Sequence, residues 1–263
     1  SVGSIALLFF GMGGVYFFSS FYLQSVRGYS PLDTGLLAVP FALAQLLMAP
    51  RSAALVQRFG VRAVMVTGML ADAVAIGGWV FLGTATPIWL VAVLFFIQGA
   101  GLGLAVPTAT ATVMESLPRE RAGAGSALTN TARQVAVALS VAVLGSILSA
   151  AYRSSLNPTL DKLPAGVRDT AGSSITATQT VAAQLGRAGQ FLLEPANSAF
   201  VDAMRLTTGI AAALAVVGAV AMMRWMPGRK RPTIEELVAA EVAAAERELE
   251  AGNFPERPEL SER

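Results

Sequence analysis

Six long apolar runs set the strongest limit on what this chain can fold into. A helix rises about 1.5 Å per residue, so roughly 20 apolar residues cross the ~30 Å hydrocarbon core of a bilayer. Because backbone groups inside a bilayer must be paired within the protein, such runs cross as helices. The predicted spans are residues 5–26, 34–54, 63–82, 88–113, 122–150 and 201–226. The sequence therefore predicts an all-α polytopic membrane protein in which residues 1–226 form a six-helix transmembrane bundle.

The amino-acid composition restricts which catalytic and metal-binding sites the chain can form. Only 14% of the residues are charged and 54% are hydrophobic, whereas a soluble domain carries about 25% charged residues. The sequence has no cysteine and no histidine, which excludes thiolate nucleophiles, disulfides, Ser-His-Asp triads and histidine-ligated metals. Any proton transfer must then depend on aspartate or glutamate. We expect no enzyme activity, no metal site, no cofactor and no nucleic-acid partner.

Two polar stretches lie between and after the spans. Residues 152–197 are rich in Ser, Thr, Gly and Ala, so we predict a long loop there with one or two short surface helices. Residues 227–263 open with a basic run, and Thr233 with Glu236 has the spacing of a capping box. That pattern predicts a cytoplasmic tail with a soluble helix over residues 234–251. We also expect the chain to be a segment of a longer protein.

The basic residues predict the orientation in the membrane. With six spans, one side carries nine of them close to the membrane, and the short loops of the other side carry only Arg27. The nine are Arg51, Arg58, Arg62, Arg119, Arg121, Arg224, Arg229, Lys230 and Arg231. Short loops with many basic residues face the cytoplasm. We therefore expect both ends of this segment to be cytoplasmic and the loop over residues 152–197 to lie outside.

Three stretches of the sequence carry a family resemblance. The first is Tyr22-Leu23-Gln24 with Gly28-Tyr29-Ser30-Pro31-Leu32, Gly35-Leu36-Leu37 and Pro40; the second is Leu55 to Arg62; the third is Asn130-Thr131-Ala132-Arg133-Gln134. Together they resemble the major facilitator superfamily of transporters. The third is similar to the fourteen-span drug:proton antiporters of the QacA/EmrB type, and the long loop before the last span fits that group too. The resemblance covers all six spans and matches the C-terminal half of such a transporter.

The resemblance implies a function and partners. It implies the C-terminal half of a proton-coupled multidrug efflux antiporter, built as a 3+3 inverted repeat that rocks against the other half to give alternating access. The implied partners are the lipid bilayer, the missing N-terminal half and a small amphipathic or cationic substrate, with the proton as coupling ion. The implied location is the plasma membrane, which in this case is the inner membrane of a bacterium. The alternative is a non-transporting membrane scaffold or an accessory half-transporter subunit.

The basic connector over residues 51–62 is similar to the superfamily's cytoplasmic loop motif at Gln57, Arg58, Gly60 and Arg62. It departs from that motif at Gln57, where the family has an acid, and at Ala53, where it has a glycine. In the family this acid meets a helix N-terminus of the opposite half, where the helix dipole favours negative charge. Since glutamine has no charge, we expect this copy to be the weaker latch.

A sharper latch site is expected at the start of the fifth span. Gly123, Gly125 and Ser126 lie there, where a helix N-terminus could receive the acidic loop residue of the missing half.

Arg133 is one of two ionisable residues deep within the predicted spans. A charge at the centre of a lone span costs ~2.5–3.5 kcal/mol, so such residues usually face protein or water. We expect Asn130 and Gln134 to share its helix face. Arg133 is then either an anchor in the polar pathway, contacting substrate, a carboxylate or the missing half, or a structural arginine that bonds carbonyls.

Asp72 is the other deep ionisable residue. It is either the carboxylate that loads and unloads a proton or a structural polar contact between helices, and a pair with Arg133 stays open. Further pathway candidates are Gln98, Gln24 and Tyr16, because the resemblance places their spans beside the cavity. Their alternative interpretation is ordinary helix packing and an interfacial aromatic belt.

Overall fold

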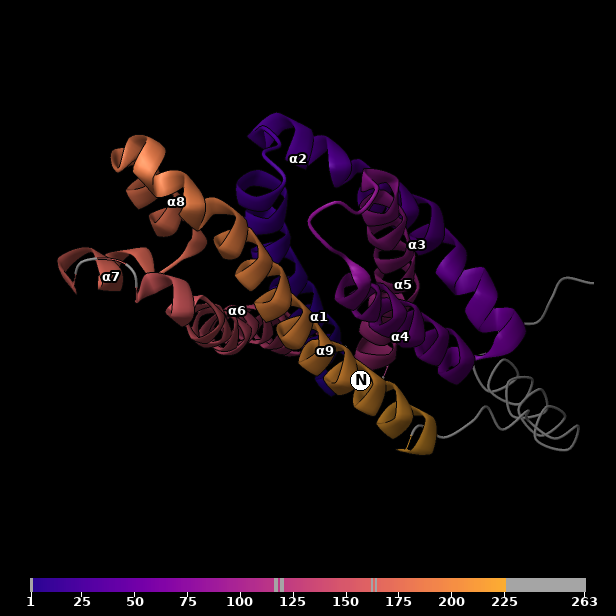
Figure 1. The fold of residues 1–263 in the computed structure, drawn as a ribbon. Coiled ribbons are helices and arrows are strands. Elements are labelled where there is room, and N and C mark those ends of the chain that lie inside the picture. The colour runs from indigo at the N-terminus through magenta and orange to yellow at the C-terminus, as the bar shows by residue number, and fades with distance from the viewer. Residues whose placement is uncertain (1, 116–117, 119–120, 162, 164, 226–263) are drawn as a thin grey trace, which may run out of the picture. The chain divides into compact units, whose positions relative to one another are not determined.

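The described part of the chain is a bundle of long helices (Figure 1). The computed structural model describes residues 2–115, 118, 121–161, 163 and 165–225. The helices are α1 (Val2–Phe21), α2 (Pro31–Leu37), α3 (Val39–Phe59), α4 (Val61–Gly78), α5 (Ile88–Glu115), α6 (Ala122–Leu160), α7 (Ala165–Ala171), α8 (Ile175–Gln184) and α9 (Leu193–Trp225), with a π-helical turn η1 (Tyr22–Val26) and 3₁₀ turns η2 (Trp79–Phe81) and η4 (Gly186–Leu192). The predicted tail and its helix over residues 234–251 lie outside the described residues.

Six of the described segments are long and apolar enough to cross a membrane, which confirms the predicted all-α polytopic bundle. They are Val2–Val26, Pro31–Phe59, Val61–Phe81, Ile88–Glu115, Ala122–Leu160 and Gly186–Arg224. The short surface helices predicted in the polar loop correspond to α7 and α8.

The polar loop is shorter than predicted, because helices extend into it from both ends. Helix α6 continues to Leu160 instead of ending near residue 150, and α9 begins at Leu193 instead of near residue 201. The reason is an apolar stripe with four-residue spacing along α6, consisting of Leu144, Leu148, Tyr152, Leu156 and Leu160, all of them buried. Residues four apart share a helix face, so the stripe keeps packing while the polar residues between them face outward.

The basic connector is also mostly helical, contrary to its description as a connector. Helix α3 runs through Arg51 and Arg58 to Phe59, and α4 starts at Val61. Between them stands Gly60 with φ 87°, a conformation that glycine adopts without the steric cost of a side chain. The chain therefore reverses at a single glycine, and the arginines project from helix ends.

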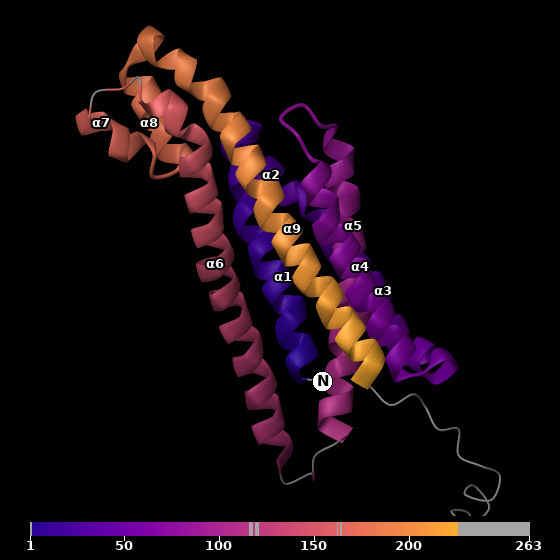
Figure 2. The ribbon, with the colours of Figure 1, turned by 60° about the horizontal axis from the view of Figure 1, so that its bottom comes forward.

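Figure 2 shows the two ends of the bundle, which are joined by different side-chain contacts. At one end, here named the basic end, the Ser4 hydroxyl donates to the Met222 sulfur, and Arg62 donates to the carbonyl of Met223. At the other, the hairpin end, the Tyr22 hydroxyl donates to the Gly83 carbonyl at 2.7 Å. The α7–α8 hairpin lies at this second end. The start of α1 and the end of α9 thus share one end, as an even number of crossings requires.

Helix pairing in the bundle is reciprocal. Helix α3 packs on α5 and α6 packs on α1, while α4 packs on both α5 and α9. A 3+3 repeat relates spans one to three to spans four to six. Under that relation the contact of α3 with α5 corresponds to the contact of α6 with α1. This is the pairing that a 3+3 repeat would produce.

Glycines let these helices approach closely. A Cβ on Gly68 would lie 2.7 Å from the carbonyl oxygen of Gly101, and one on Gly13 would lie 3.3 Å from the Cα of Val137. Small residues at such positions allow backbone contact between membrane helices. The α4–α5 and α1–α6 contacts therefore depend on positions without side chains.

Candidate functional site

A cavity of about 500 Å³ opens near the basic end between α1, α5 and α6, and we name it the basic-end cavity. It is lined by Ile5, Phe9, Val106, Thr110, Gly123, Ser126, Ala127, Thr129, Asn130 and Arg133. Its volume lies in the range of sites for drug-sized molecules. It brings together four predicted site residues, two from the latch and two from the polar pathway.

Arg133 is the charged residue of this lining. Its Nη2 donates to Asn130 Oδ1 at 2.6 Å, and its guanidinium carbon lies 5.3 Å from the centroid of the Phe9 ring. A guanidinium within about 6 Å of an aromatic face is attracted to it. Arg133 and Asn130 are exposed, whereas Phe9 is buried. The aromatic face and the amide therefore hold the guanidinium at the cavity wall while one side stays open.

Hydroxyl groups and a helix start complete the polar lining. Thr110 Oγ1 donates to the Val106 carbonyl and Thr129 Oγ1 to the Gly125 carbonyl, each at 2.9 Å. Both hydroxyl oxygens keep lone pairs that can accept a further bond. Helix α6 starts beside the cavity without a side-chain cap, so its first backbone N–H groups have no partner within the helix.

Two of the predicted residues on α6 lie elsewhere. Gln134 is exposed but does not line the cavity, so it is not brought together there with Asn130 and Arg133. Gly125 is buried and also lies outside the cavity lining.

Asp72 lies inside the bundle and away from this cavity. Gln98 Nε2 donates to Asp72 Oδ1 at 3.2 Å, and the two residues are 1% and 0% exposed. Asp72 also faces α1, since a Cβ on Gly11 would lie 3.3 Å from its Oδ2. Arg133 is bonded to Asn130 instead. The two deep charges thus have different partners, and the open question of an Asp72–Arg133 pair is answered by two separate polar contacts.

The remaining pathway candidates are dispersed. Tyr16 is 38% exposed and packs its ring against Phe41 and Phe95, with centroids 5.8 and 6.3 Å away. Gln24 is exposed on the π-helical turn η1. Neither lines the basic-end cavity.

The loop-motif residues surround the α3–α4 junction. Arg58 lies over the ring of Phe59 at 5.2 Å, and Arg62 bonds the end of α9 through the Met223 carbonyl. Gln57 is exposed on the same last turn of α3. The motif therefore joins α3, α4 and α9 at the basic end.

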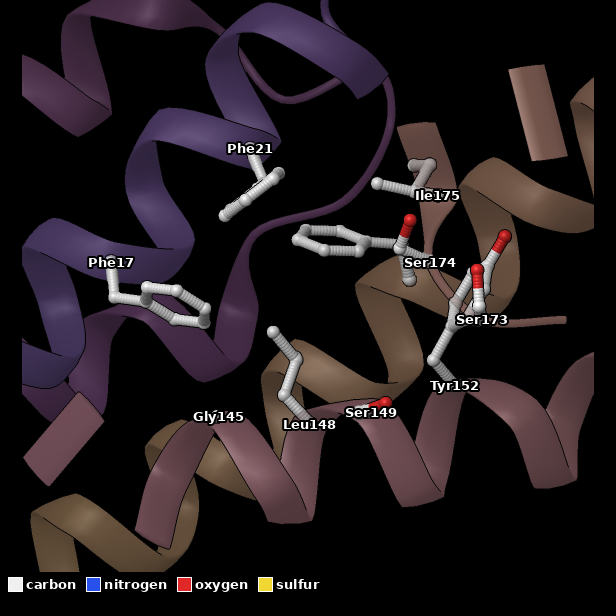
Figure 3. A pocket seen from close by; sticks show the side chains of 10 residues that line it. Phe17, Phe21, Gly145, Leu148, Ser149, Tyr152, Ser173, Ser174 and Ile175 are labelled. Atoms are coloured by element: carbon white, nitrogen blue, oxygen red, sulfur yellow. The ribbon is translucent and has the colours of Figure 1, made fainter. Parts of the chain in front are cut away.

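A second pocket, which the sequence interpretation missed, lies at the hairpin end. We name it the hairpin-end pocket; it has a volume of about 190 Å³ and is lined by Phe17, Phe21, Gly145, Leu148, Ser149, Tyr152, Ser173, Ser174, Ile175 and Phe200. Figure 3 shows Phe17 and Phe21 projecting from α1 toward Leu148 and Ile175. Four of these ten residues, Tyr152, Ser173, Ser174 and Ile175, come from the segment interpreted as a loop. The aromatic pair on α1 and the stripe on α6 were the available signals.

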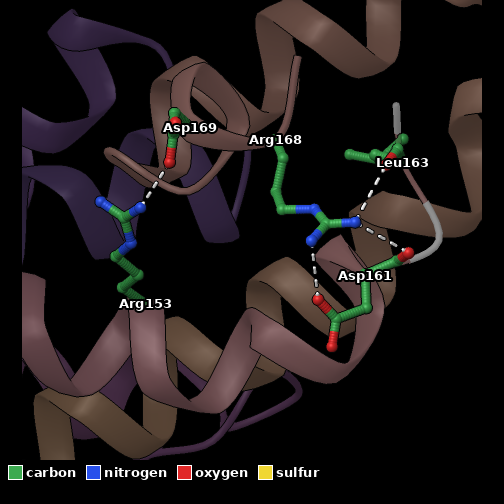
Figure 4. A network of polar contacts seen from close by, with 5 residues as sticks. All are labelled: Arg153, Asp161, Leu163, Arg168 and Asp169. Atoms are coloured by element: carbon green, nitrogen blue, oxygen red, sulfur yellow. Dashed lines mark hydrogen bonds and ion pairs between the residues drawn. The ribbon is translucent and has the colours of Figure 1, made fainter. Parts of the chain in front are cut away.

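Polar contacts brace the hairpin beside this pocket. The buried Tyr152 hydroxyl and Thr178 Oγ1 are 2.7 Å apart in a hydrogen bond. Arg153 pairs with Asp169 at 2.6 Å and Arg168 pairs with Asp161 at 3.2 Å (Figure 4). Both ion pairs are largely exposed, and exposed pairs contribute about 0–1 kcal/mol. The buried hydroxyl pair and the aromatic packing therefore hold the hairpin more firmly than the ion pairs.

Comparison with known proteins identifies the family to which this chain belongs. The sequence profile of the Major Facilitator Superfamily matches residues 2–141, more than half of the chain. The chain belongs to the major facilitator superfamily. Six apolar helices and this membership make it a multi-pass membrane protein.

Several relatives are named for drug export. The chain is 31% identical to the tetracenomycin C resistance and export protein of Streptomyces glaucescens, over 83% of this chain and 42% of that protein. It is 32% identical to the multidrug efflux pump LfrA of Mycolicibacterium smegmatis, over 80% of this chain and 42% of the pump. It is 28% identical to the multidrug resistance protein Stp of Mycobacterium tuberculosis, over 86% and 44%. The chain thus spans less than half the length of these relatives.

Proposed function

We propose that this chain is the C-terminal half of a proton-coupled multidrug efflux antiporter of the fourteen-span type, which works by alternating access. The observation that carries the proposal is the polar face of α6, where Ser126, Asn130 and Arg133 are all exposed and line the basic-end cavity. Arg133 lies about 16 Å along α6 from its first residue, a depth at which contact with lipid costs ~2.5–3.5 kcal/mol. A second bundle therefore covers this face, with a water-filled pathway between the two.

The relatives and the charges support the rest of the proposal. Relatives named as multidrug efflux and resistance proteins suggest a small amphipathic substrate and no enzyme activity. The arginines near the basic end suggest that this end is cytoplasmic in a bacterial inner membrane. The N-terminal half of the same transporter and the surrounding lipid are then the chain's partners.

Efflux by the intact transporter tests the polar face. Arg133→Ala is expected to reduce drug efflux from cells by at least about tenfold at equal expression, because the guanidinium is lost from the pathway. Leu128→Ala, an exposed apolar position on the same helix, is the matched control and should leave efflux near the wild-type rate. Wild-type efflux by Arg133→Ala would contradict the role of this face. A wild-type chain that exports nothing in its native membrane would favour the scaffold alternative.

We propose the proton as coupling ion and Asp72 as its carrier, because Asp72 is the one buried carboxylate in the part of the chain that the structure describes. Asp72→Asn keeps a hydrogen-bonding partner for Gln98 but cannot release a proton. The variant is expected to bind drug normally and to lose pH-gradient-driven transport in proteoliposomes. Retained gradient-driven transport would instead assign Asp72 to helix packing.

A further inference from the structure

The lining of the basic-end cavity carries a positive charge that no acidic side chain of the lining balances. Arg133 is the one charged side chain in its lining. Among the described residues, Asp72 is buried against Gln98, and Glu115, at the end of α5, is not part of the cavity lining. The other described carboxylates belong to the hairpin end or its helices, at Asp33, Asp161, Asp169, Glu194 and Asp202. Within the described residues, the cavity lining therefore presents a positive charge and no acid.

The guanidinium is also positioned to bind an oxygen acid. Its five N–H donors form a rigid fork, and one nitrogen is used by Asn130 Oδ1. The guanidinium carbon lies over the Phe9 ring, 5.3 Å from its centroid, and the group lines the cavity, where its remaining donors can meet an occupant. A planar fork of this kind matches a carboxylate or another anionic oxygen better than an ammonium point charge would.

The walls around Arg133 fit a flat aromatic molecule. Phe9, Ile5 and Val106 supply apolar surface, while Thr110 and Thr129 supply hydroxyl oxygens. Sites for drug-sized ligands combine mostly apolar walls with a few placed polar groups. An occupant with a ring system against the walls and an anionic oxygen at the guanidinium would satisfy both parts.

We propose that Arg133 makes this cavity selective for amphipathic aromatic molecules that carry an anionic oxygen, a carboxylate or a phenolate, over cationic molecules of the same shape. The inference rests on the proposed transport function and specifies its substrate class. It differs from the cationic substrates implied by the family resemblance, because it follows from the charge in this chain's own cavity.

Two dyes with one skeleton test the selectivity. Fluorescein methyl ester carries a phenolate on its xanthene ring, and its diamino analogue carries a positive charge on the same ring. Binding to the intact, purified transporter is measured for each dye by fluorescence anisotropy. The wild type is expected to bind the phenolate dye about tenfold more tightly than the cationic dye. A charge-assisted hydrogen bond is equivalent to about a 10- to 100-fold change in affinity, so Arg133→Gln should weaken phenolate binding by that factor and leave cation binding unchanged.

Asn130→Asp is the complementary variant, because it places a carboxylate beside the guanidinium without removing it. It is expected to lower phenolate affinity and raise cation affinity, each by several-fold. Arg224→Gln, which removes an exposed arginine at the end of α9 outside the cavity, is the control and should change neither affinity. If Arg133→Gln binds neither dye, Asn130→Asp decides, because it retains the arginine.

Equal loss of both dyes across the cavity variants, or tighter wild-type binding of the cationic dye, would overturn the inference. A measurement of drug efflux distinguishes a failure of this inference from a failure of the proposed function. A transporter that exports amphipathic drugs but shows no Arg133-dependent dye preference keeps the function and rejects this inference. A protein that shows the dye preference but exports nothing rejects the function and keeps the binding site.

Discussion

The same two helices, α1 and α6, line both the basic-end cavity and the hairpin-end pocket, yet the two sites differ in chemistry. At the hairpin end the chain supplies its own cover through α8, and the lining is aromatic and uncharged. At the basic end α6 leaves Asn130 and Arg133 exposed. The chain thus closes the first site with its own apolar packing, whereas it leaves polar groups of the second site exposed.

The largest effect is expected where both sites depend on one contact, the close approach of α1 and α6. A Cβ on Gly13 would lie 3.2–3.3 Å from Ser140 atoms and 3.3 Å from the Cα of Val137. Overpacking of this kind costs typically 1–3 kcal/mol, so Gly13→Leu should destabilise the intact protein by about 3 kcal/mol, measured by unfolding in detergent micelles. It should also disturb both sites at once.

Gly3→Leu is the matched control for that substitution. It lies on the same helix, and a Cβ there would meet nothing within 4 Å. Both substitutions change helix propensity in the same direction, so their difference isolates the packing cost. Equal stabilities would show that α1 and α6 do not need the close contact.

An intermediate effect is expected from the buried hydroxyl pair of the hairpin end. Tyr152→Phe removes the hydrogen bond to Thr178 and should destabilise the hairpin by about 1 kcal/mol. Hydrogen exchange should increase in α8 and stay unchanged around Arg133. A cycle with Thr178→Val measures the coupling; a coupling near zero, or faster exchange at the basic end, would contradict the separation of the two sites.

The smallest effect is expected from the exposed ion pair of the hairpin. Arg153 and Asp169 are 53% and 82% exposed in their side chains, so Asp169→Asn should change stability by less than about 0.5 kcal/mol. That difference should vanish in 1 M salt, where charges are screened within about 3 Å. A larger, salt-independent loss in thermal unfolding would mean that the hairpin depends on charge as well as on packing.

Run length and spacing within a helix predicted much of this molecule. Six spans followed from apolar runs, and the contact of Arg133 with Asn130 has the spacing of residues one turn apart. Spacing alone did not separate Gln134, which lies four residues from Asn130 but stays outside the cavity lining. The extension of α6 was missed because average polarity hides a stripe of Tyr152, Leu156 and Leu160 between polar neighbours.

Contacts between distant residues could not be predicted in this way. The partner of Asp72 is Gln98, on a different helix, and nothing in either local sequence selects it. The hairpin-end pocket needs Phe17, Tyr152 and Phe200 from three helices together. Such sites depend on how helices are rotated against one another, which close contacts at Gly13, Gly68 and Gly101 help to set.

The sequence by itself determined that the chain lies in a lipid bilayer and that its fold is all-α. The reason is that the length and apolarity of each run decide whether it can cross a bilayer as a helix. Its arginines also marked the basic end. Only the tertiary structure decided which polar groups meet: it buried Asp72 against Gln98 and opened Arg133 to a cavity. The physical reason is that burial and pairing are properties of helix contacts, and these depend on the packing of residues far apart along the chain.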